Sequence, residues 1–357
     1  MTATRILTPA LALDLDAFES NLIQMARLAR ESGKALRPHF KAHKCVEVAR
    51  RQIAAGACGV CVATLAEAEV AAKAGITGLL LTSPMADPAK MARIVKTGAM
   101  VVSDHVQQVN WYQEAAAAAD RTVEVLVDLD PGDHRTGARS VEQAVEIAVA
   151  IDRASHLRLG GIQAYSVSGS HAETPEHKRT LAEAVAGRIL ATRDAFARYD
   201  LYANLLTGGS TGSCQADCGL SGLNELQAGS YALMDMAYQR IGAEFRQALT
   251  VLTTVISANH PGMVTVDGGY KAFSTDRGYG PQPMDLPGAS YRWGGDEFGF
   301  VDVTAGDRLP ELGEQIEFVP PHCDPTVNLH DRIYVRRGSQ VEAVWPVMDR
   351  LTRRDAD

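Results

Sequence analysis

Short apolar segments alternate regularly with longer amphipathic segments along most of this 357-residue chain. Val60–Val62 and Leu79–Leu81 are apolar throughout, as parallel strands buried on both faces should be. The intervening segments carry apolar residues at helical spacing. Eight strands are predicted in this way, each followed by a helix or a loop of crossover length: Ala35–Phe40, Gly59–Thr64, Gly78–Thr82, Met100–Ser103, Thr122–Asp130, Leu159–Tyr165, Ala203–Thr207 and Glu225–Ala228.

This alternation predicts the α/β class and a TIM-type (β/α)8 barrel, because eight βα units in about two hundred residues match the size of that fold. A doubly wound open sheet is the alternative, since the number of strands does not establish closure. No GxGxxG motif opens a helix after the first strand, which disfavours a Rossmann dinucleotide site.

A C-terminal β domain is predicted to follow the barrel. After about residue 236, Gly, Pro and aromatic residues become dense and helical patterns end. The apolar segment Ala10–Asp14 precedes the barrel and is expected to pair into this second domain. The predicted domains are therefore a barrel at 15–236 and a β domain at 1–14 and 237–357. Its expected strands are Leu252–Ile256, Met263–Val266, Gln315–Val319 and Ile333–Val335.

Composition restricts the class of partner and the compartment. The net charge is −8 and the basic residues are dispersed, which argues against nucleic acid or an anionic membrane as a partner. The apolar runs are far shorter than a membrane span and the N-terminus lacks a signal pattern, so we expect a cytoplasmic protein. Cys58 and Cys61 have CxxC spacing, but no second Cys pair at zinc-ribbon spacing follows. We predict them to be small buried residues.

The stretch from Ala35 to Lys44 is the first candidate for chemistry. Strand alternation places Arg37, His39 and Lys41 on one face, with Lys41 near the strand end where a barrel opens. Imine formation needs a neutral lysine amine, and burial beside other cations favours that form. A solvated strand end rich in basic residues is the alternative interpretation.

Polar residues after the other strands form a candidate constellation, because barrel active sites lie at the carboxyl ends of the strands. In the loop 208–213, three glycines and the hydroxyls of Ser210, Thr211 and Ser213 favour an anion such as phosphate. Together with an inward lysine, this loop indicates a phosphate-bearing aldehyde cofactor, although alone it resembles a surface turn. The remaining candidates are Arg135, Gln163, Tyr165, His171, Thr207 and Tyr231.

The segment His322-Cys323-Asp324 is the third candidate. On a strand, His322 and Asp324 would share one face while Cys323 points away. An imidazole and a carboxylate suit a divalent cation whose other positions are filled by water or substrate. A polar surface turn is the alternative.

Six ordered motifs resemble the D-threonine aldolase family, among the fold-type III, alanine racemase-like pyridoxal-phosphate enzymes and related to D-serine dehydratases. The similarity extends from Thr8 to Pro346. The motifs are Arg37-Pro-His-Phe-Lys-Ala-His-Lys-Cys45, His134-Arg-Thr-Gly137, Gln163-Ala-Tyr165, Thr207-Gly-Gly-Ser-Thr-Gly-Ser213, Glu225-Leu-Gln-Ala-Gly-Ser-Tyr231 and His322-Cys-Asp-Pro-Thr-Val-Asn-Leu-His-Asp331.

The resemblance implies a role for each candidate in binding pyridoxal 5′-phosphate and a small amino acid substrate. It makes Lys41 the Schiff-base lysine, Arg135 the arginine near the cofactor's phenolic oxygen and His171 the base for the substrate hydroxyl. His322 and Asp324 correspond to ligands of a divalent cation, with Mn²⁺ expected and Mg²⁺, Co²⁺ or Zn²⁺ as alternatives. A homodimer is also implied. The other cofactor-binding positions are Gln163, Tyr165, Thr207, Gly209, Ser210, Thr211, Gly212 and Tyr231.

The chain also departs from the family pattern. Ser166 follows Tyr165 where the family has histidine, and Phe298 stands where it has another histidine. The His-x-Asp pair favours the aldolase branch, since the dehydratases carry His-x-Cys. The expected reaction is cleavage of a D-β-hydroxy-α-amino acid to glycine and an aldehyde. A dehydratase, an amino acid racemase and a non-catalytic carrier of pyridoxal phosphate are the alternatives.

Overall fold

The computed structural model describes residues 5–304, 306, 308–348 and 350. The chain folds into two compact units. The barrel unit contains Gln24–Lys41 and Val48–Gly229, and the β unit contains Met1–Ile23, Ala42–Glu47 and Ser230–Asp357.

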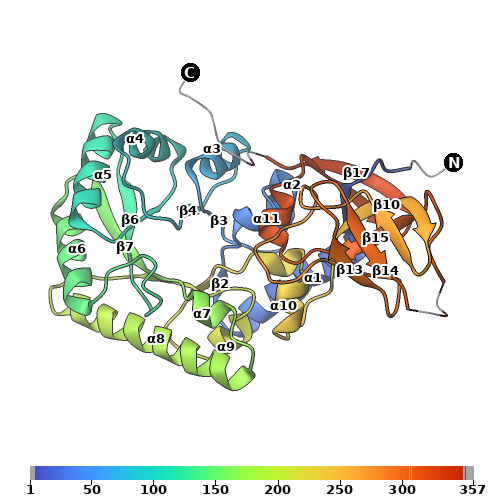
Figure 1. Ribbon diagram of the computed structural model, residues 1–357. Helices are drawn as coiled ribbons and strands as arrows, with labels where there is room; N and C mark the ends of the chain where they lie inside the picture. Colours follow the sequence, from blue (N-terminus) through green and yellow to red (C-terminus); the bar gives the residue numbers. More distant parts are fainter. Residues whose placement is uncertain (1–4, 305, 307, 349, 351–357) are drawn as a thin grey trace. The chain divides into compact units, whose positions relative to one another are not determined.

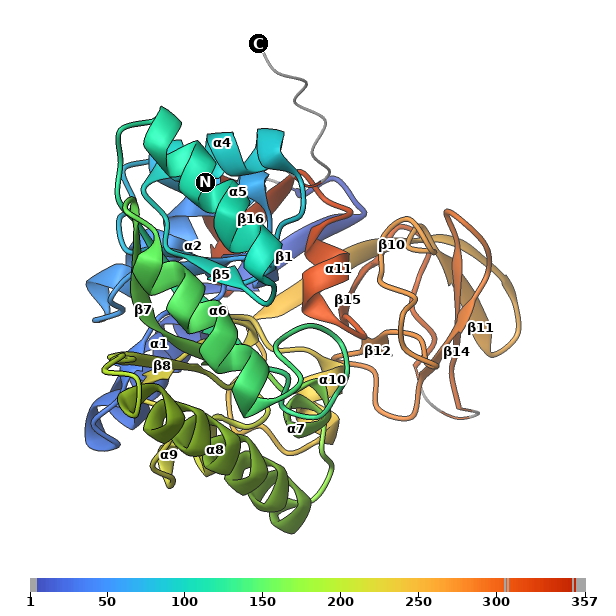
Figure 2. The same ribbon diagram turned by 90° about the vertical axis from the view of Figure 1, so that its left-hand side faces the viewer.

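The barrel unit consists of parallel strands alternating with helices, as predicted. Figure 1 shows α4, α5, α6 and α8 around the outside of strands β6 and β7, and α8 runs along one side of this unit in Figure 2 as well. Its strands are β2 (Ala35–Leu36), β3 (Val60–Val62), β4 (Leu79–Leu81), β5 (Val101–Ser103), β6 (Val123–Asp128), β7 (Leu157–Ala164), β8 (Leu205–Gly208) and β9 (Glu225–Leu226). Its helices are α2 (Val46–Ala54), α3 (Leu65–Lys73), α4 (Pro88–Thr97), α5 (Val106–Ala118), α6 (Val141–Arg153), α7 (Val167–Ser170), α8 (Pro175–Ala197) and α9 (Cys214–Cys218).

The eight strands close into a ring. Six form one sheet in the order β2-β9-β8-β7-β6-β5, every pair of which is parallel, and β3 pairs with β4. Single parallel bridges complete the circle, one between His39 and Cys61 and one between Leu80 and Met100. Closure confirms the predicted barrel and excludes the open doubly wound sheet.

Local sequence signals explain where several helices begin and end. Before α4, the Asp87 side chain accepts hydrogen bonds from the amides of Ala89 and Lys90, and Pro88 occupies the first helical position, where it loses no bond. Gly98 ends this helix with φ of 76°, a left-handed conformation that glycine adopts without strain. These explicit start and stop signals explain why α4 begins at Pro88 and ends at Thr97.

Inside the barrel, one layer of side chains is apolar. Cys61, Leu80, Val102 and Leu126 are fully buried and form one cluster contributed by four successive strands. Cys61 is therefore buried as predicted, whereas Cys58 is exposed, and the prediction of burial was wrong for that residue. It lies before the first residue of β3, outside the buried strand.

The first barrel strand is shorter than expected, which corrects the predicted position of Lys41. β2 ends at Leu36 instead of Phe40, and Lys41 lies in a 3₁₀ turn, η1 (Phe40–Ala42). Pro38 has no N–H to donate to a ladder, so the alternating pattern does not continue as a paired strand.

The β unit contains one nine-stranded sheet. Its path is β13-β14-β11-β10-β1-β16-β17, and β15 joins β10 to β12. β1 pairs antiparallel with β10 and parallel with β16, so the first strand of the chain is an interior strand of this sheet. Figure 2 shows β10, β11 and β14 side by side. The strands are β1 (Ala10–Asp14), β10 (Leu249–His260), β11 (Met263–Val266), β12 (Gln282–Pro283), β13 (Ser290–Trp293), β14 (Gly299–Asp302), β15 (Gln315–Val319), β16 (Arg332–Arg337) and β17 (Gln340–Pro346).

The remaining elements are helical. α1 (Leu15–Glu31) follows β1 directly and belongs to the β unit up to Ile23 and to the barrel unit from Gln24. The β unit contains η2 (Ser230–Ala232), α10 (Met236–Arg240) and α11 (Cys323–Val327). Among the described residues, no helix is both long enough and apolar enough to cross a membrane.

Candidate active site

Lys41, Tyr165 and Arg135 come together in the barrel unit. The Lys41 Nζ atom lies 5.8 Å from the centroid of the Tyr165 ring, and the Arg135 guanidinium carbon lies 4.8 Å from the same centroid. Both distances are those of cation–π contacts. The Tyr165 ring therefore brings two cations from distant parts of the sequence to one place, just beyond the end of β7.

His171 and Ser166 lie at the two ends of α7, which follows Tyr165. Ser166 is the N-cap residue, and its Oγ atom accepts a hydrogen bond of 2.9 Å from the Gly169 amide. His171 is the C-cap and is half-buried. The hydroxyl that replaces the family's histidine at position 166 is thus engaged in capping a helix.

The predicted phosphate loop is a compact turn of buried hydroxyl groups. The Ser210 and Ser213 hydroxyl oxygens are 3.0 Å apart, and the Ser210 amide donates to Ser213 Oγ at 3.0 Å. Gly209 has φ of 73°, and a Cβ there would lie 2.5 Å from an Asp217 carboxylate oxygen, so only glycine fits. Burial raises the pKa of Asp217 to about 6, against a hydrogen bond from Ser213 that lowers it.

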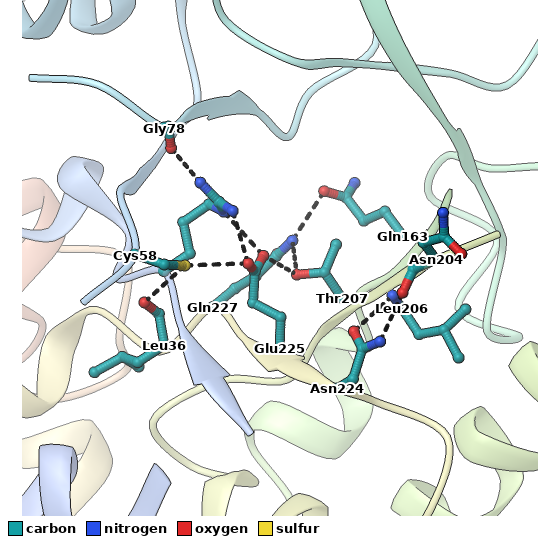
Figure 3. A network of polar contacts seen from close by, with 11 residues as sticks. Leu36, Cys58, Gly78, Gln163, Asn204, Leu206, Thr207, Asn224, Glu225 and Gln227 are labelled. Carbon is teal, nitrogen blue, oxygen red and sulfur yellow. Dashed lines mark hydrogen bonds and ion pairs between the residues drawn. The ribbon is translucent and has the colours of Figure 1, made fainter. Parts of the chain in front are cut away.

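A chain of buried polar side chains crosses the barrel interior (Figure 3). Arg37 donates to both carboxylate oxygens of Glu225, at 2.9 and 2.8 Å, and Thr207 Oγ1 donates to Glu225 at 2.9 Å. Gln227 Nε2 lies 3.1 Å from both Thr207 Oγ1 and Gln163 Oε1. The hydroxyl of Thr207 is thus already shared between two protein groups, and this chain holds it and Gln163 in fixed orientations.

Asp128 ends this buried chain. Gln163 Nε2 donates to Asp128 at 2.9 Å, and Thr136 Oγ1 donates to its other oxygen at 2.9 Å. Burial raises the pKa of Asp128 to about 6, although both hydrogen bonds oppose the shift. Both amide protons of Gln163 are donated within the protein, since the second reaches the Thr82 carbonyl oxygen.

We expect Asp128→Asn to change how stability depends on pH. The raised pKa means that the folded protein holds the proton more tightly than the unfolded chain. The stability contributed by the protonated Asp128 side chain is fully present below the pKa of the unfolded chain and is lost as pH rises through about 6. The free energy of unfolding of the variant minus that of wild type should therefore increase by about 1–3 kcal/mol as the pH is raised from 4.5 to 8, measured by urea unfolding. Asp152→Asn, on the exposed side of α6, should show no such gain. An equal difference at both pH values would contradict the expectation.

In the β unit, His322 and Asp324 lie at the start of a helix, which corrects the predicted strand. His322 is the N-cap of α11, and Asp324 is its second helical residue. His322 Nδ1 lies 2.7 Å from a carboxylate oxygen of Asp276. That contact favours a proton on Nδ1 and leaves the Nε2 lone pair for a ligand, as in histidines that bind metals.

Other residues of the β unit hold this helix start in place. Fully buried Asp235 accepts a hydrogen bond of 2.7 Å from the Cys323 amide, and burial raises its pKa above the usual value. Asp324 accepts from Ser230 Oγ at 3.2 Å. Tyr231, next in sequence, is buried, with its ring centroid 5.6 Å from that of Phe245. Among the described residues, no group of three or more His, Cys, Asp or Glu side chains could hold a metal ion.

Comparisons with known proteins agree with this geometry. Residues 13–260 match the family model for the alanine racemase N-terminal domain, and residues 248–336 match a serine dehydratase domain. The chain belongs to the alanine racemase-like family. A 3-hydroxy-D-aspartate aldolase from Paracoccus denitrificans (strain Pd 1222) is 36% identical over 98% of this chain and 94% of the relative.

Two D-threonine aldolases are similar to the chain in the same way. One, from an Arthrobacter species, is 36% identical over 97% of this chain and 93% of its own. The crystal structure of the other, from Filomicrobium marinum, superposes with a TM-score of 0.93 at 36% identity and covers 98% of this chain and 99% of that one. The resemblance inferred from the motifs is confirmed.

The alanine racemase-like family comprises fold-type III pyridoxal-phosphate enzymes, and the barrel residues fit that cofactor. Half-buried Lys41 faces the ring of Tyr165, and the Arg135 guanidinium lies over the same ring. The loop after β8 offers the Gly212 amide beside the buried hydroxyls of Ser210 and Thr211, as a phosphate requires.

Sequence reasoning missed the residues that support the candidates. Gln227 could have been found, because it is two positions from Glu225 on an inward face. Asp276 orients His322 from 46 residues away and carried no signal in the sequence. Asp235 and Asp128 are likewise known only from their contacts.

Proposed function

We propose that the chain is a lyase that cleaves the Cα–Cβ bond of a D-β-hydroxy-α-amino acid such as D-threonine, giving glycine and an aldehyde. The observation that supports it is the Lys41–Tyr165–Arg135 arrangement in a chain similar to named aldolases over nearly its whole length. The proposal includes pyridoxal phosphate in the barrel domain, 15–236, and a divalent cation, with Mn²⁺ preferred, in the β domain at 1–14 and 237–357. It also includes a homodimer.

In the barrel, each proposed residue has a defined task. The amine of Lys41 would bind the cofactor's aldehyde carbon. The Arg135 guanidinium, which lies over the same Tyr165 ring as Lys41, would place its positive charge beside the cofactor. The loop residues Gly209, Ser210, Thr211 and Gly212 would bind the phosphate, and Thr207 and Tyr231 are assigned to the cofactor site from the family pattern. Gln163 and Tyr165 would orient the ring. Bound pyridoxal phosphate supplies an electron sink for the charge that develops at Cα.

The proton on the substrate hydroxyl must also be removed. His171 is proposed to accept it as general base, and His322 and Asp324 are proposed to hold the cation, with Asp276 fixing the His322 ring. A bound divalent cation lowers the cost of deprotonating the β-hydroxyl.

Product analysis tests the proposal. Holoenzyme prepared with pyridoxal phosphate and Mn²⁺ should convert D-threonine to acetaldehyde and glycine. Formation of 2-oxobutanoate would show a dehydratase, an alternative that the match of residues 248–336 to a serine dehydratase domain keeps in view. Inversion at Cα would show a racemase, and the absence of any product a carrier.

We expect a preference for uncharged, bulky substrates. Phe298 and Ser166 replace two histidines of the family pattern, so neither position can present a positive charge to an anionic side chain. D-phenylserine should therefore be favoured over D-3-hydroxyaspartate in kcat/KM. Phe298→His should shift this ratio toward 3-hydroxyaspartate by roughly 5- to 150-fold, or about 1–3 kcal/mol. Tyr202→His, at an exposed aromatic residue after α8, is the control. A wild-type preference for 3-hydroxyaspartate would disprove the idea.

A further inference from the structure

One carboxylate outside the proposed catalytic set joins two loops of the barrel unit. Asp133 lies in the loop between β6 and α6, and its oxygens accept hydrogen bonds from the Val167 amide and the Ser168 hydroxyl, both at 2.5 Å. The Ser168 amide lies 3.4 Å from each carboxylate oxygen. A side chain from one loop thus binds the first turn of α7 in the next.

Both of the joined loops carry groups with proposed functions. Arg135 follows Asp133 by two residues, and its guanidinium lies over the ring of Tyr165. Tyr165 precedes α7, and His171 ends it. The bonds made by Asp133 therefore link the cation of one loop to the aromatic ring and the proposed base of the other.

Hydrogen bonds other than those of Asp133 hold the loop that carries this residue. Asp130 accepts hydrogen bonds from the amides of Gly132 and His134, at 2.9 and 3.1 Å. The Gly137 amide donates to Asp104 at 3.0 Å. Because these hydrogen bonds hold the loop in one conformation, the bonds from Asp133 also hold α7, and with it His171, in a fixed position relative to the strand ends.

The charge state of Asp133 suits this task. Partial burial raises its pKa, but the hydrogen bonds from Ser168, Val167 and Ser166 outweigh burial and hold the pKa below its usual value. The side chain is an anion at neutral pH, and hydrogen bonds to an ionised acceptor are stronger than neutral ones.

We propose that Asp133 is a positioning residue that clasps the loop bearing Arg135 to the helical turn bearing His171. The roles of Arg135 and His171 rest on the proposed function, whereas the clasp itself does not. Asp133 acts through the groups that it holds in place.

The test compares Asp133→Asn, Ser168→Ala and the control Asp152→Asn as holoenzymes. Asp133→Asn removes the negative charge and replaces one of the two acceptor oxygens by a donor NH2 group that faces the N–H and O–H donors of α7, so hydrogen exchange in peptides covering 166–171 should accelerate by about 10-fold or more. Turnover of D-threonine should fall roughly 10- to 100-fold in kcat, with KM changed less than about 3-fold. The visible circular dichroism of the bound cofactor should weaken. Ser168→Ala should show smaller changes of the same kind, and Asp152→Asn none.

Two results would overturn the proposal. Unchanged exchange in 166–171 would mean that Asp133 does not hold α7, whatever happens to activity. Faster exchange with unchanged kcat and dichroism would mean that the clasp does not position the site. If Asp133→Asn fails to fold, Ser168→Ala decides by the same criteria. If wild type cleaves no D-β-hydroxy amino acid, the proposed function fails, and exchange and dichroism still decide the clasp.

Discussion

Replacing Lys41 by alanine should abolish turnover and, with it, the near-visible absorbance of the bound cofactor. Lys41 faces the ring of Tyr165 at 5.8 Å, in a turn at the mouth of the barrel. A covalent bond between its amine and the cofactor aldehyde is the proposed anchor, and no neighbouring hydroxyl can replace an amine in that bond. The loss in kcat/KM should be on the order of 10³-fold or more. Absorbance spectra and product assays on one preparation measure both effects.

Lys44→Ala is the matched control for this prediction. Lys44 lies three residues further on, but its Nζ atom donates to Asn328 Oδ1 at 2.9 Å within the β unit. Its replacement should leave the absorbance intact. If instead the Lys41 variant keeps both signals and the Lys44 variant loses them, the anchor has been assigned to the wrong lysine.

Removal of the divalent cation should stop turnover while the cofactor stays bound. The cation and the cofactor are proposed to be bound by different residues, the cation by His322 and Asp324 and the cofactor by Lys41. Treatment with a chelator should therefore lower kcat on the order of 10²-fold or more without changing the absorbance spectrum, and added Mn²⁺ should restore activity. Elemental analysis before and after treatment measures the bound metal.

Variants locate the cation. His322→Ala and Asp324→Ala should both lose metal and activity, and Asp276→Asn should weaken metal binding roughly 10- to 100-fold, because it orients the His322 ring. His260→Ala, at the exposed end of β10, should retain full metal content. Full activity in metal-free enzyme would remove the cation from the mechanism and favour the racemase alternative.

The barrel was predictable because its signals are local and repeated. Apolar triplets such as Val60–Val62 and capped helices such as α4 each specify their own conformation, and eight of them in order leave few possible folds. Closure was less certain, because single bridges such as His39–Cys61 leave no pattern in the sequence.

Local ambiguity explains the two errors near the site. In Ala35–Phe40 apolar and polar residues do alternate, but Pro38 has no N–H to donate to a neighbouring strand. At His322–Asp324 three residues are too few to distinguish a strand from the first turn of a helix, and Pro325 is tolerated in that first turn. The supporting carboxylates Asp133 and Asp276 act through space, so they could be recognised only from the folded chain.

The place of β1 in its sheet has a consequence for biosynthesis. This strand lies between β10 and β16, so both of its hydrogen-bonding edges need partners that come much later in the chain. The ribosome makes β10 about 235 residues after β1, which takes roughly 10–50 s at the usual speed of translation. During that interval an apolar strand with two unpaired edges emerges well before its partners. We therefore expect the nascent chain to depend on chaperones until both β10 and β16 have been made, and to aggregate when translation pauses inside the barrel.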